Sequence, residues 1–226
     1  LSCAELALSP REQLLIAHVQ QSIERADQGL SKLPPQALEV QGMSSPKVRH
    51  LLNNLCSLPR AGYLEIGCWM GSTWIASLCE NYPTMSLAVA IDNWSQFGGS
   101  TQEFSSNCNR FLKNYDYQFY ELDCFQVNLE SIFHSPVTIY FYDGDHEESS
   151  QKQAFTYYNR VFDDVFIAIV DDWNLDRAQN GTRTAFRELN YQVLYERVLP
   201  SRFNCDVENW WNGLYVAVIR KPSATQ

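Results

Sequence analysis

The sequence predicts a doubly wound α/β fold, in which a mostly parallel sheet of seven strands is covered by helices on both faces. Three observations predict it. From Tyr63 onward, short apolar runs rich in β-branched and aromatic residues alternate with amphipathic segments, which is typical of parallel strands joined by helices. A glycine turn follows the first run, and acidic residues end the second, fourth and fifth runs. The loop before the last run is too short for a crossover helix of normal length, so the last strand is expected to be antiparallel.

Each element is predicted by its local pattern. Strands are expected over 63–67, 87–92, 117–122, 137–142, 165–170, 191–197 and 213–219. Helices are expected over 73–81, 103–114, 126–133, 149–160 and 177–189. Two further helices precede the sheet. Ser9 and Glu12 form a capping box ahead of a helix over about 10–28, and Ser45, followed by a proline at the first helical position, begins the second.

Length and composition indicate one main domain with a short addition. The chain has 226 residues, of which 45% are hydrophobic and 19% are charged, as in ordinary globular proteins. Neither N-terminal helix carries residues that suggest chemistry. Residues 1–42 are therefore expected to form a helical appendage and linker, and residues 43–226 the domain that carries the function.

Charge and cysteine usage exclude several classes of protein. The net charge of -9 argues against binding to nucleic acid, and no apolar run approaches the roughly 18 residues that cross a bilayer. The seven cysteines are scattered, odd in number and never paired as C-x-x-C, which disfavours a zinc site or a disulfide scaffold. We therefore expect reduced cysteines and a cytoplasmic protein. A homodimer is left open.

A glycine turn joins the first strand to the following helix. Gly67 and Gly71 allow a sharp backbone turn and a close approach to a ligand. The third glycine of the dinucleotide-binding pattern G-x-G-x-x-G is missing, which makes an NAD-dependent oxidoreductase a distant alternative. The Gly-Lys-Ser/Thr sequence of a P-loop is missing as well. A turn whose glycines serve packing alone is the remaining alternative.

The segment from Glu65 to Thr73 resembles the E/D-x-G-x-x-x-G motif of class I S-adenosylmethionine-dependent methyltransferases, which have a Rossmann-like sheet. Asp92 strengthens the resemblance because it ends the second strand, where such enzymes hold ribose hydroxyls. The resemblance implies that Asp92 binds the ribose of S-adenosylmethionine and that Asp123 and Cys124 lie near its adenine. The residues that it places around the methionine part are Glu65, Gly67, Gly71, Ser72 and Thr73.

Acidic residues also follow the fourth and fifth strands. Asp143, Asp145 and His146 come after the fourth strand, and Asp171 and Asp172 come after the fifth. Neighbouring parallel strands present such residues to one crevice at their carboxyl ends. Carboxylates gathered there repel each other unless a proton or a cation lies between them, and oxygen-rich clusters suit Mg²⁺. In the alternative without metal, Asp143 caps a helix, and Asp171 and Asp172 form hydrogen bonds on the cofactor side.

These motifs together, over roughly residues 40–220, resemble the small-molecule O-methyltransferases related to the macrocin and novobiocin tailoring enzymes. The resemblance implies that Asp143, Asp171 and Asp172 hold a divalent metal, and that Asp145 or His146 serves as the base for a sugar or phenol hydroxyl. Two alternatives remain open. One is methyl transfer without metal, using His146 or Asp145 as the base, and the other is a cofactor-binding protein without catalysis.

Two features bear on the substrate pocket. The tyrosine that such enzymes carry shortly after the Asp-Gly-Asp-His run is replaced by an acidic stretch beginning at Glu147. Trp94 and Trp173 each follow an acid that is expected to face a ligand, so they are expected to line the substrate pocket or cover the cofactor. Ordinary packing is the alternative for both.

Overall fold

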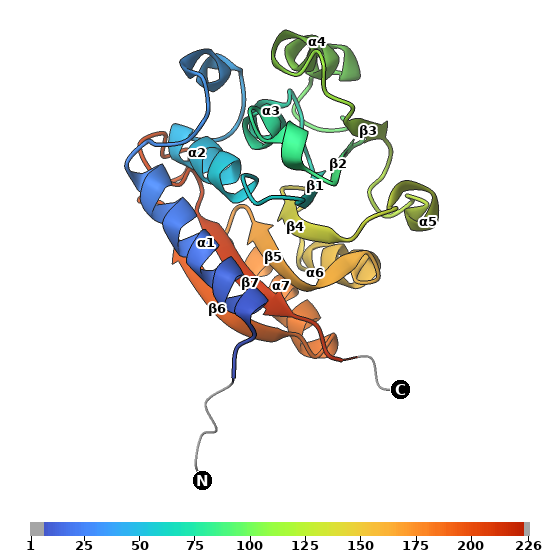
Figure 1. Ribbon diagram of the computed structural model, residues 1–226. Coiled ribbons are helices and arrows are strands. Elements are labelled where there is room, and N and C mark those ends of the chain that lie inside the picture. The colour runs from blue at the N-terminus through green and yellow to red at the C-terminus, as the bar shows by residue number, and fades with distance from the viewer. Residues whose placement is uncertain (1–6, 224–226) are drawn as a thin grey trace.

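The computed structural model describes residues 7–223 and shows a sheet between two layers of helices (Figure 1). Its seven strands have the order β3-β2-β1-β4-β5-β7-β6. Strands β1 to β6 run in one direction, and β7 is antiparallel to both of its neighbours. The strand bounds are β1 Gly62–Ile66, β2 Leu87–Asp92, β3 Gln118–Glu121, β4 Val137–Tyr142, β5 Phe162–Val170, β6 Gln192–Leu199 and β7 Leu214–Arg220. The predicted fold class is confirmed, including the antiparallel last strand.

Helices cover both faces of this sheet (Figure 1). Their bounds are α1 Pro10–Asp27, α2 Pro46–Leu55, α3 Ser72–Leu78, α4 Thr101–Phe111, α5 Leu129–Ile132, α6 Glu148–Tyr158 and α7 Asp176–Glu188, with 3₁₀ turns at Pro35–Glu39 and Tyr82–Thr84. Buried side chains of α1 to α4 form one hydrophobic cluster with one face of the sheet, and those of α5 to α7 form a second cluster with the other face. Both faces are therefore buried, as a doubly wound sheet requires.

Strand β1 shows how one short segment serves both layers. Successive side chains of a strand point to opposite faces, so Tyr63 enters the cluster beneath α2 and α3 while Leu64 and Ile66 enter the other. All five residues of β1 are buried. The carboxyl end of a strand that is covered on both faces and on both edges is a rigid support for the turn that follows it.

The N-terminal helices begin as predicted and pack on the sheet. Ser9 and Glu12 form the reciprocal capping box of α1, and the Ser45 hydroxyl caps α2. Leu15 and Val19 of α1 are buried in the cluster that includes β7, and the Glu12 carboxylate is paired with the guanidinium of Arg220 in β7. The division of the chain at residue 42 remains a prediction.

Strand β5 begins earlier than expected. The stretch from Phe162 to Asp164, outside the predicted strand over 165–170, lies in the strand. Phe162 pairs with Val137 before a register shift, and the Lys221 amide donates to the Asp164 carbonyl. Among the described residues, no helix combines the length and the apolar character that crossing a membrane requires. The cysteines in this part of the chain are all free thiols.

Candidate active site

The glycine turn after β1 lies directly against the end of β4. Gly67 has a φ of +82°, and a Cβ atom at this position would lie 2.0 Å from the carbonyl oxygen of Asp143. Gly71 has a φ of +85°, and its Cβ would lie 3.1 Å from the ring of Phe104. Only glycine combines this backbone conformation with so close an approach. The predicted cofactor turn and the predicted acidic cluster therefore lie side by side.

Glu65 stands at the base of this turn and is fully buried. Its carboxylate accepts hydrogen bonds from the hydroxyls of Thr73 at 2.6 Å and Tyr63 at 2.5 Å. Burial raises the pKa of Glu65 to about 7, because the charged form loses its hydration. Since both oxygens are engaged inside the protein, Glu65 and Thr73 join β1 to the first turn of α3 and act as supports for the site.

Asp92 ends β2 and organises the two loops beside it. One oxygen accepts the backbone N–H of Trp69 at 2.7 Å, and the other accepts that of Trp94, also at 2.7 Å. The Trp94 indole N–H in turn donates to the Trp69 carbonyl at 2.8 Å. Each carboxylate oxygen keeps a further lone pair, so Asp92 can hold its loops and still accept hydroxyl groups of a ligand.

The residues after β3 are ordered by the opposite helix layer. Asp123 accepts the backbone N–H of Phe125 at 2.9 Å, and the Cys124 carbonyl accepts the Tyr158 hydroxyl at 2.5 Å. Burial raises the pKa of the Cys124 thiol to about 12, so it stays protonated at neutral pH. Both residues follow β3 next to β2, as expected from the sequence.

Four side chains gather beyond β4 and β5, and we call Asp143, His146, Asp171 and Asp172 the acidic cluster. The His146 Nε2 atom lies 3.2 Å from Asp172 Oδ2 and 3.7 Å from Asp143 Oδ1. Asp172 has a φ of +52°, which a short polar side chain tolerates better than most. The structure thus brings together the ends of both strands.

Two carboxyl groups of this cluster compete for ionisation. Burial, reinforced by the nearby aspartates, raises the pKa of Asp143 well above its usual range. Burial and the charge of Asp172 raise the pKa of Asp171 to about 7. Oδ1 of Asp171 is buried without a hydrogen-bond partner among the described residues. This arrangement suits a pair that holds a proton between two oxygens.

His146 belongs to the acidic cluster, whereas Asp145 does not contact it. The Nδ1 atom of His146 lies 3.2 Å from the side-chain amide of Gln151, and burial lowers the pKa of the imidazole. A neutral ring that accepts from Gln151 and donates from Nε2 to Asp172 satisfies both contacts. The Asp145 carboxylate is exposed and accepts the Ser150 hydroxyl at 2.5 Å.

The sequence pattern does not reveal two polar partners of the cluster. Gln151, on α6, is fully buried and also accepts the hydroxyl of Thr182 on α7 at 3.3 Å. Asn212, in the loop before β7, donates its side-chain amide to Asp172 at 2.7 Å. The burial of Gln151 marks it as a partner of the cluster, but only the tertiary structure shows that burial.

The segment before α2 closes the other side of the glycine turn. Arg49 is buried and donates to the Leu38 and Val40 carbonyls at 2.8 Å each and to the Ser44 hydroxyl at 2.9 Å. The Ser44 hydroxyl in turn lies 3.5 Å from that of Ser72. Burial lowers the pKa of Arg49 to about 10. This guanidinium therefore holds the linker against the first turn of α3.

Of the two tryptophans predicted to line the pocket, one belongs to the core. Trp173 is 4% exposed and stacks on Tyr215 with ring centroids 4.2 Å apart, so packing explains its position. Trp94 is partly exposed and meets Phe104 edge-on at 5.6 Å, beside the turn that Asp92 holds. Trp94 thus remains available to a ligand on the cofactor side.

The donor set of the acidic cluster matches a hard divalent ion only in part. Its oxygens are of the type that Mg²⁺ prefers, and the buried Oδ1 of Asp171 has no hydrogen-bond partner among the described residues. However, residues 7–223 contain no group of three or more His, Cys, Asp or Glu side chains arranged to hold an ion. The cluster as it stands is not a ready-formed metal site.

Neither a protein-family model nor a curated protein sequence matches this chain. Solved structures do resemble it. The O-methyltransferase of Bacillus cereus in complex with S-adenosylhomocysteine (SAH) has a TM-score of 0.51 and 16% identity, over 96% of this chain and 94% of that one. TomG of Streptomyces achromogenes, an O-methyltransferase involved in tomaymycin synthesis and solved with S-adenosylmethionine, has a TM-score of 0.54 and 15% identity, over 97% and 93%.

The chain has the Rossmann-like methyltransferase fold. TrmN of Thermus thermophilus shares it, with a TM-score of 0.56 and 12% identity over 83% of this chain. The present chain spans about half of TrmN, 52% of its length. At these identities the likeness concerns the fold, and function has to be argued from the site itself.

Proposed function

We propose that this chain is an S-adenosylmethionine-dependent methyltransferase that methylates a hydroxyl group of a small molecule, such as a sugar or a phenol. The observation that carries this proposal is the contact between Gly67 and the Asp143 carbonyl. It unites a turn suited to a cofactor with a cluster of groups that can accept a proton, at the strand ends where doubly wound folds bind ligands.

The cofactor is proposed to lie over the ends of β1, β2 and β3. S-adenosylmethionine supplies, when bound, a methyl group on a cationic sulfonium. Asp92 would accept the ribose hydroxyls, Asp123 and Cys124 would border the adenine, and Ser72, beside Ser44, would face the methionine part. Glu65 and Thr73 support this surface from below, and Gly67 and Gly71 leave it free of side chains. The negative charge of the acidic cluster favours a cationic ligand nearby.

The acceptor hydroxyl is proposed to lose its proton to His146. For this step Nε2 must be free of hydrogen, so the ring proton must move to Nδ1 and Gln151 must turn its oxygen towards it. Gln151 can do so because its partner, the Thr182 hydroxyl, both donates and accepts hydrogen bonds. Asp172 then stabilises the imidazolium from 3.2 Å. Gln151 is thereby a positioning residue. Its amide N–H on Nδ1 favours the ring protonated on Nε2, and its oxygen in that place would favour the ring that can accept a proton.

Asp145 remains the alternative base, and metal binding by Asp143, Asp171 and Asp172 remains a prediction. The unpartnered Oδ1 of Asp171 favours either a proton or an ion. A protein that binds cofactor without catalysing transfer remains the other class. We derive no step through a metal, because the cluster is not arranged as a complete ligand set.

Two measurements test the proposal in sequence. Calorimetric titration of the full chain with SAH should show saturable micromolar binding, and the absence of binding would overturn the cofactor assignment. A transfer assay with labelled S-adenosylmethionine over a panel of phenols and sugars then tests catalysis. Cofactor binding without transfer to any acceptor would favour the non-catalytic alternative.

A further inference from the structure

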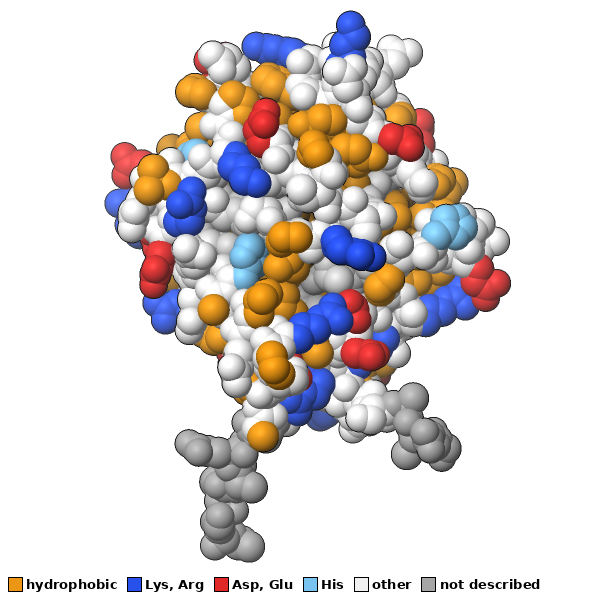
Figure 2. All heavy atoms as spheres, viewed as in Figure 1, with side chains coloured by type: hydrophobic (Ala, Val, Ile, Leu, Met, Phe, Trp, Pro, Cys, Tyr) orange, Lys and Arg blue, Asp and Glu red, His pale blue; other side chains and the backbone are white. Residues whose placement is uncertain are grey.

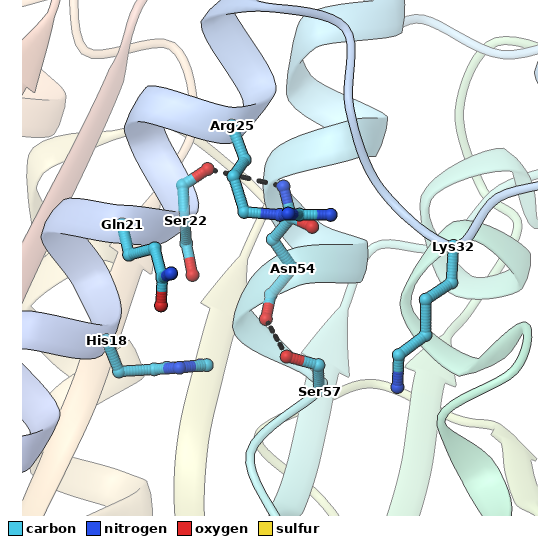
Figure 3. Close-up of a pocket in the computed structure, with 7 residues that line it drawn as sticks. All are labelled: His18, Gln21, Ser22, Arg25, Lys32, Asn54 and Ser57. Atoms are coloured by element: carbon cyan, nitrogen blue, oxygen red, sulfur yellow. Dashed lines mark hydrogen bonds between the residues drawn. The ribbon is translucent and has the colours of Figure 1, made fainter.

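A polar hollow of about 200 Å³ lies between α1 and α2, away from the strand ends that form the candidate active site. We call it the α1–α2 hollow, and Figure 3 shows its lining. The lining residues are His18, Gln21, Ser22, Arg25, Lys32, Asn54 and Ser57. All seven side chains are polar, although spaces between packed helices are commonly lined by apolar groups. Such a lining indicates a site for a polar ligand.

The charges around this hollow are of one sign. Arg25, in the last turn of α1, and Lys32, in the linker, are cationic, and no carboxylate is among the lining residues. Burial lowers the pKa of His18, whose Nε2 lies 2.8 Å from the Leu55 carbonyl, so this ring is neutral at pH 7. The surrounding protein carries a net charge of -9. Figure 2 shows both basic and acidic side chains exposed on this face, so the single sign of charge holds for the residues that line the hollow.

The donors of the two cations are largely unused. Within residues 7–223 the guanidinium of Arg25 forms neither an ion pair nor a hydrogen bond, and the Lys32 ammonium donates one hydrogen bond, to Asn81 at 3.0 Å. In Figure 3 the His18, Arg25 and Lys32 side chains approach Asn54 and Ser57 from different sides. Two cations that share a hollow repel each other, and an anion between them would relieve that repulsion.

We propose that the α1–α2 hollow binds a small tetrahedral oxyanion of the phosphate type. Arg25 provides a planar fork of donors that matches two oxygens of such an anion, and Lys32 provides a second charge. The exposed Gln21 amide adds a further donor, whereas the Ser57 hydroxyl donates to the Asn54 carbonyl at 2.6 Å and only borders the space. The volume is below the roughly 300–1,000 Å³ of sites for drug-sized ligands, so the ligand is inorganic phosphate or a short phosphate monoester.

Calorimetric titration of the full chain with inorganic phosphate, against chloride at matched ionic strength, tests the proposal. Saturable heat is expected with phosphate alone. Arg25→Gln and Lys32→Gln should each weaken binding about 10- to 100-fold, as loss of a charged hydrogen bond does. Arg60→Gln, which removes an exposed cation elsewhere, is the matched control and should bind as the wild type. Glycerol phosphate in a second arm distinguishes a monoester from the free ion.

One variant tests the hollow without changing its charge. Ser57→Leu fills the space and should abolish phosphate binding, while thermal unfolding without phosphate checks that each variant folds. The proposal is overturned if phosphate and chloride give equal heats. It is also overturned if Ser57→Leu and both charge variants bind as the wild type, or if Arg60→Gln loses as much affinity as Arg25→Gln.

Discussion

Two carboxyl groups near the carboxyl ends of the strands are buried: Glu65 in β1 and Asp171 directly after β5. Burial raises the pKa of each to about 7. Their surroundings differ. Both oxygens of Glu65 accept hydroxyl groups from Thr73 and Tyr63, whereas Oδ1 of Asp171 has no partner among the described residues. A satisfied buried carboxyl serves the structure, and an unsatisfied one retains the capacity to bind a proton or a ligand.

The same contrast separates the two halves of the candidate site. The glycine turn is held by a closed network in which Glu65, Asp92 and Trp94 all have partners. The acidic cluster concentrates like charges, and Oδ1 of Asp171 has no hydrogen-bond partner among the described residues. Under the proposed function, the turn with its closed network would shape the cofactor site, and the cluster would take up the proton.

The largest expected effect comes from Gly67→Ala, which breaks the contact between the two halves. The new Cβ would overlap the Asp143 carbonyl at 2.0 Å and would require a left-handed conformation. We expect a loss of about 3–5 kcal/mol in the free energy of unfolding and no measurable SAH binding.

Gly98→Ala is the matched control for Gly67→Ala. Its φ of +63° imposes a similar backbone strain, but no atom lies within 4 Å of the added Cβ. Urea unfolding of the two variants separates strain from overlap. Equal losses in both would show that the contact with Asp143 has no special role.

The next effect concerns the base in the acidic cluster. His146→Gln should lower kcat by about 10²- to 10⁴-fold, as removal of a general base does, with SAH affinity unchanged. Asp145→Asn is the paired variant and should retain most of the activity, because Asp145 lies outside the cluster. Steady-state kinetics with the best acceptor of the panel measure both variants. If Asp145 were the base, Asp145→Asn would lower kcat more than His146→Gln.

The pH dependence of stability tests the role of Glu65. Its folded pKa of about 7 lies above the ordinary value of 4.5, so the stability it contributes is complete below pH 4.5 and declines as pH rises to 7. Glu65→Gln should remove this decline and gain about 3 kcal/mol relative to wild type above pH 7.

Urea unfolding between pH 4.5 and 8 measures this difference. Glu130→Gln, at an exposed carboxylate, is the control and should follow the wild type throughout. A constant difference between Glu65→Gln and wild type across this range would mean that Glu65 does not titrate in it.

The smallest expected effect concerns metal. If the acidic cluster binds Mg²⁺, millimolar Mg²⁺ should stabilise the wild type by about 1–3 kcal/mol through mass action. Asp171→Asn should abolish that gain, and Glu65→Gln should retain it. Equal responses of wild type and Asp171→Asn in thermal unfolding would count against a metal at this position.

Much of the fold was predictable because its signals are local. The apolar runs that become β2 and β4 have the same bounds in the sequence pattern and in the structure, since each strand is buried on both faces and reads as a continuous apolar segment. The early start of β5 was not predictable, because Phe162 enters the strand through pairing with Val137, a residue distant in the chain.

The candidate site was predictable in position but not in its contacts. Strand ends in a parallel sheet meet at one edge, so the grouping of Asp143 and Asp171 follows from topology. The different positions of the Asp145 and His146 side chains do not follow from topology. They depend on the turn and on the contacts that each side chain makes, Asp145 with Ser150 and His146 with Gln151.

The sequence by itself determined the fold class, the order of strand ends and the types of group at each, because these depend on residue patterns within a few turns of chain. Only the tertiary structure decided which buried carboxyl groups have hydrogen-bond partners and which lack them. Glu65, within β1, and Asp171, directly after β5, are both acids of buried strands. Their difference arises from the hydroxyls of Thr73 and Tyr63, which lie against Glu65, whereas Oδ1 of Asp171 has no such partner among the described residues. Hydrogen bonding of buried groups is a property of the packed whole.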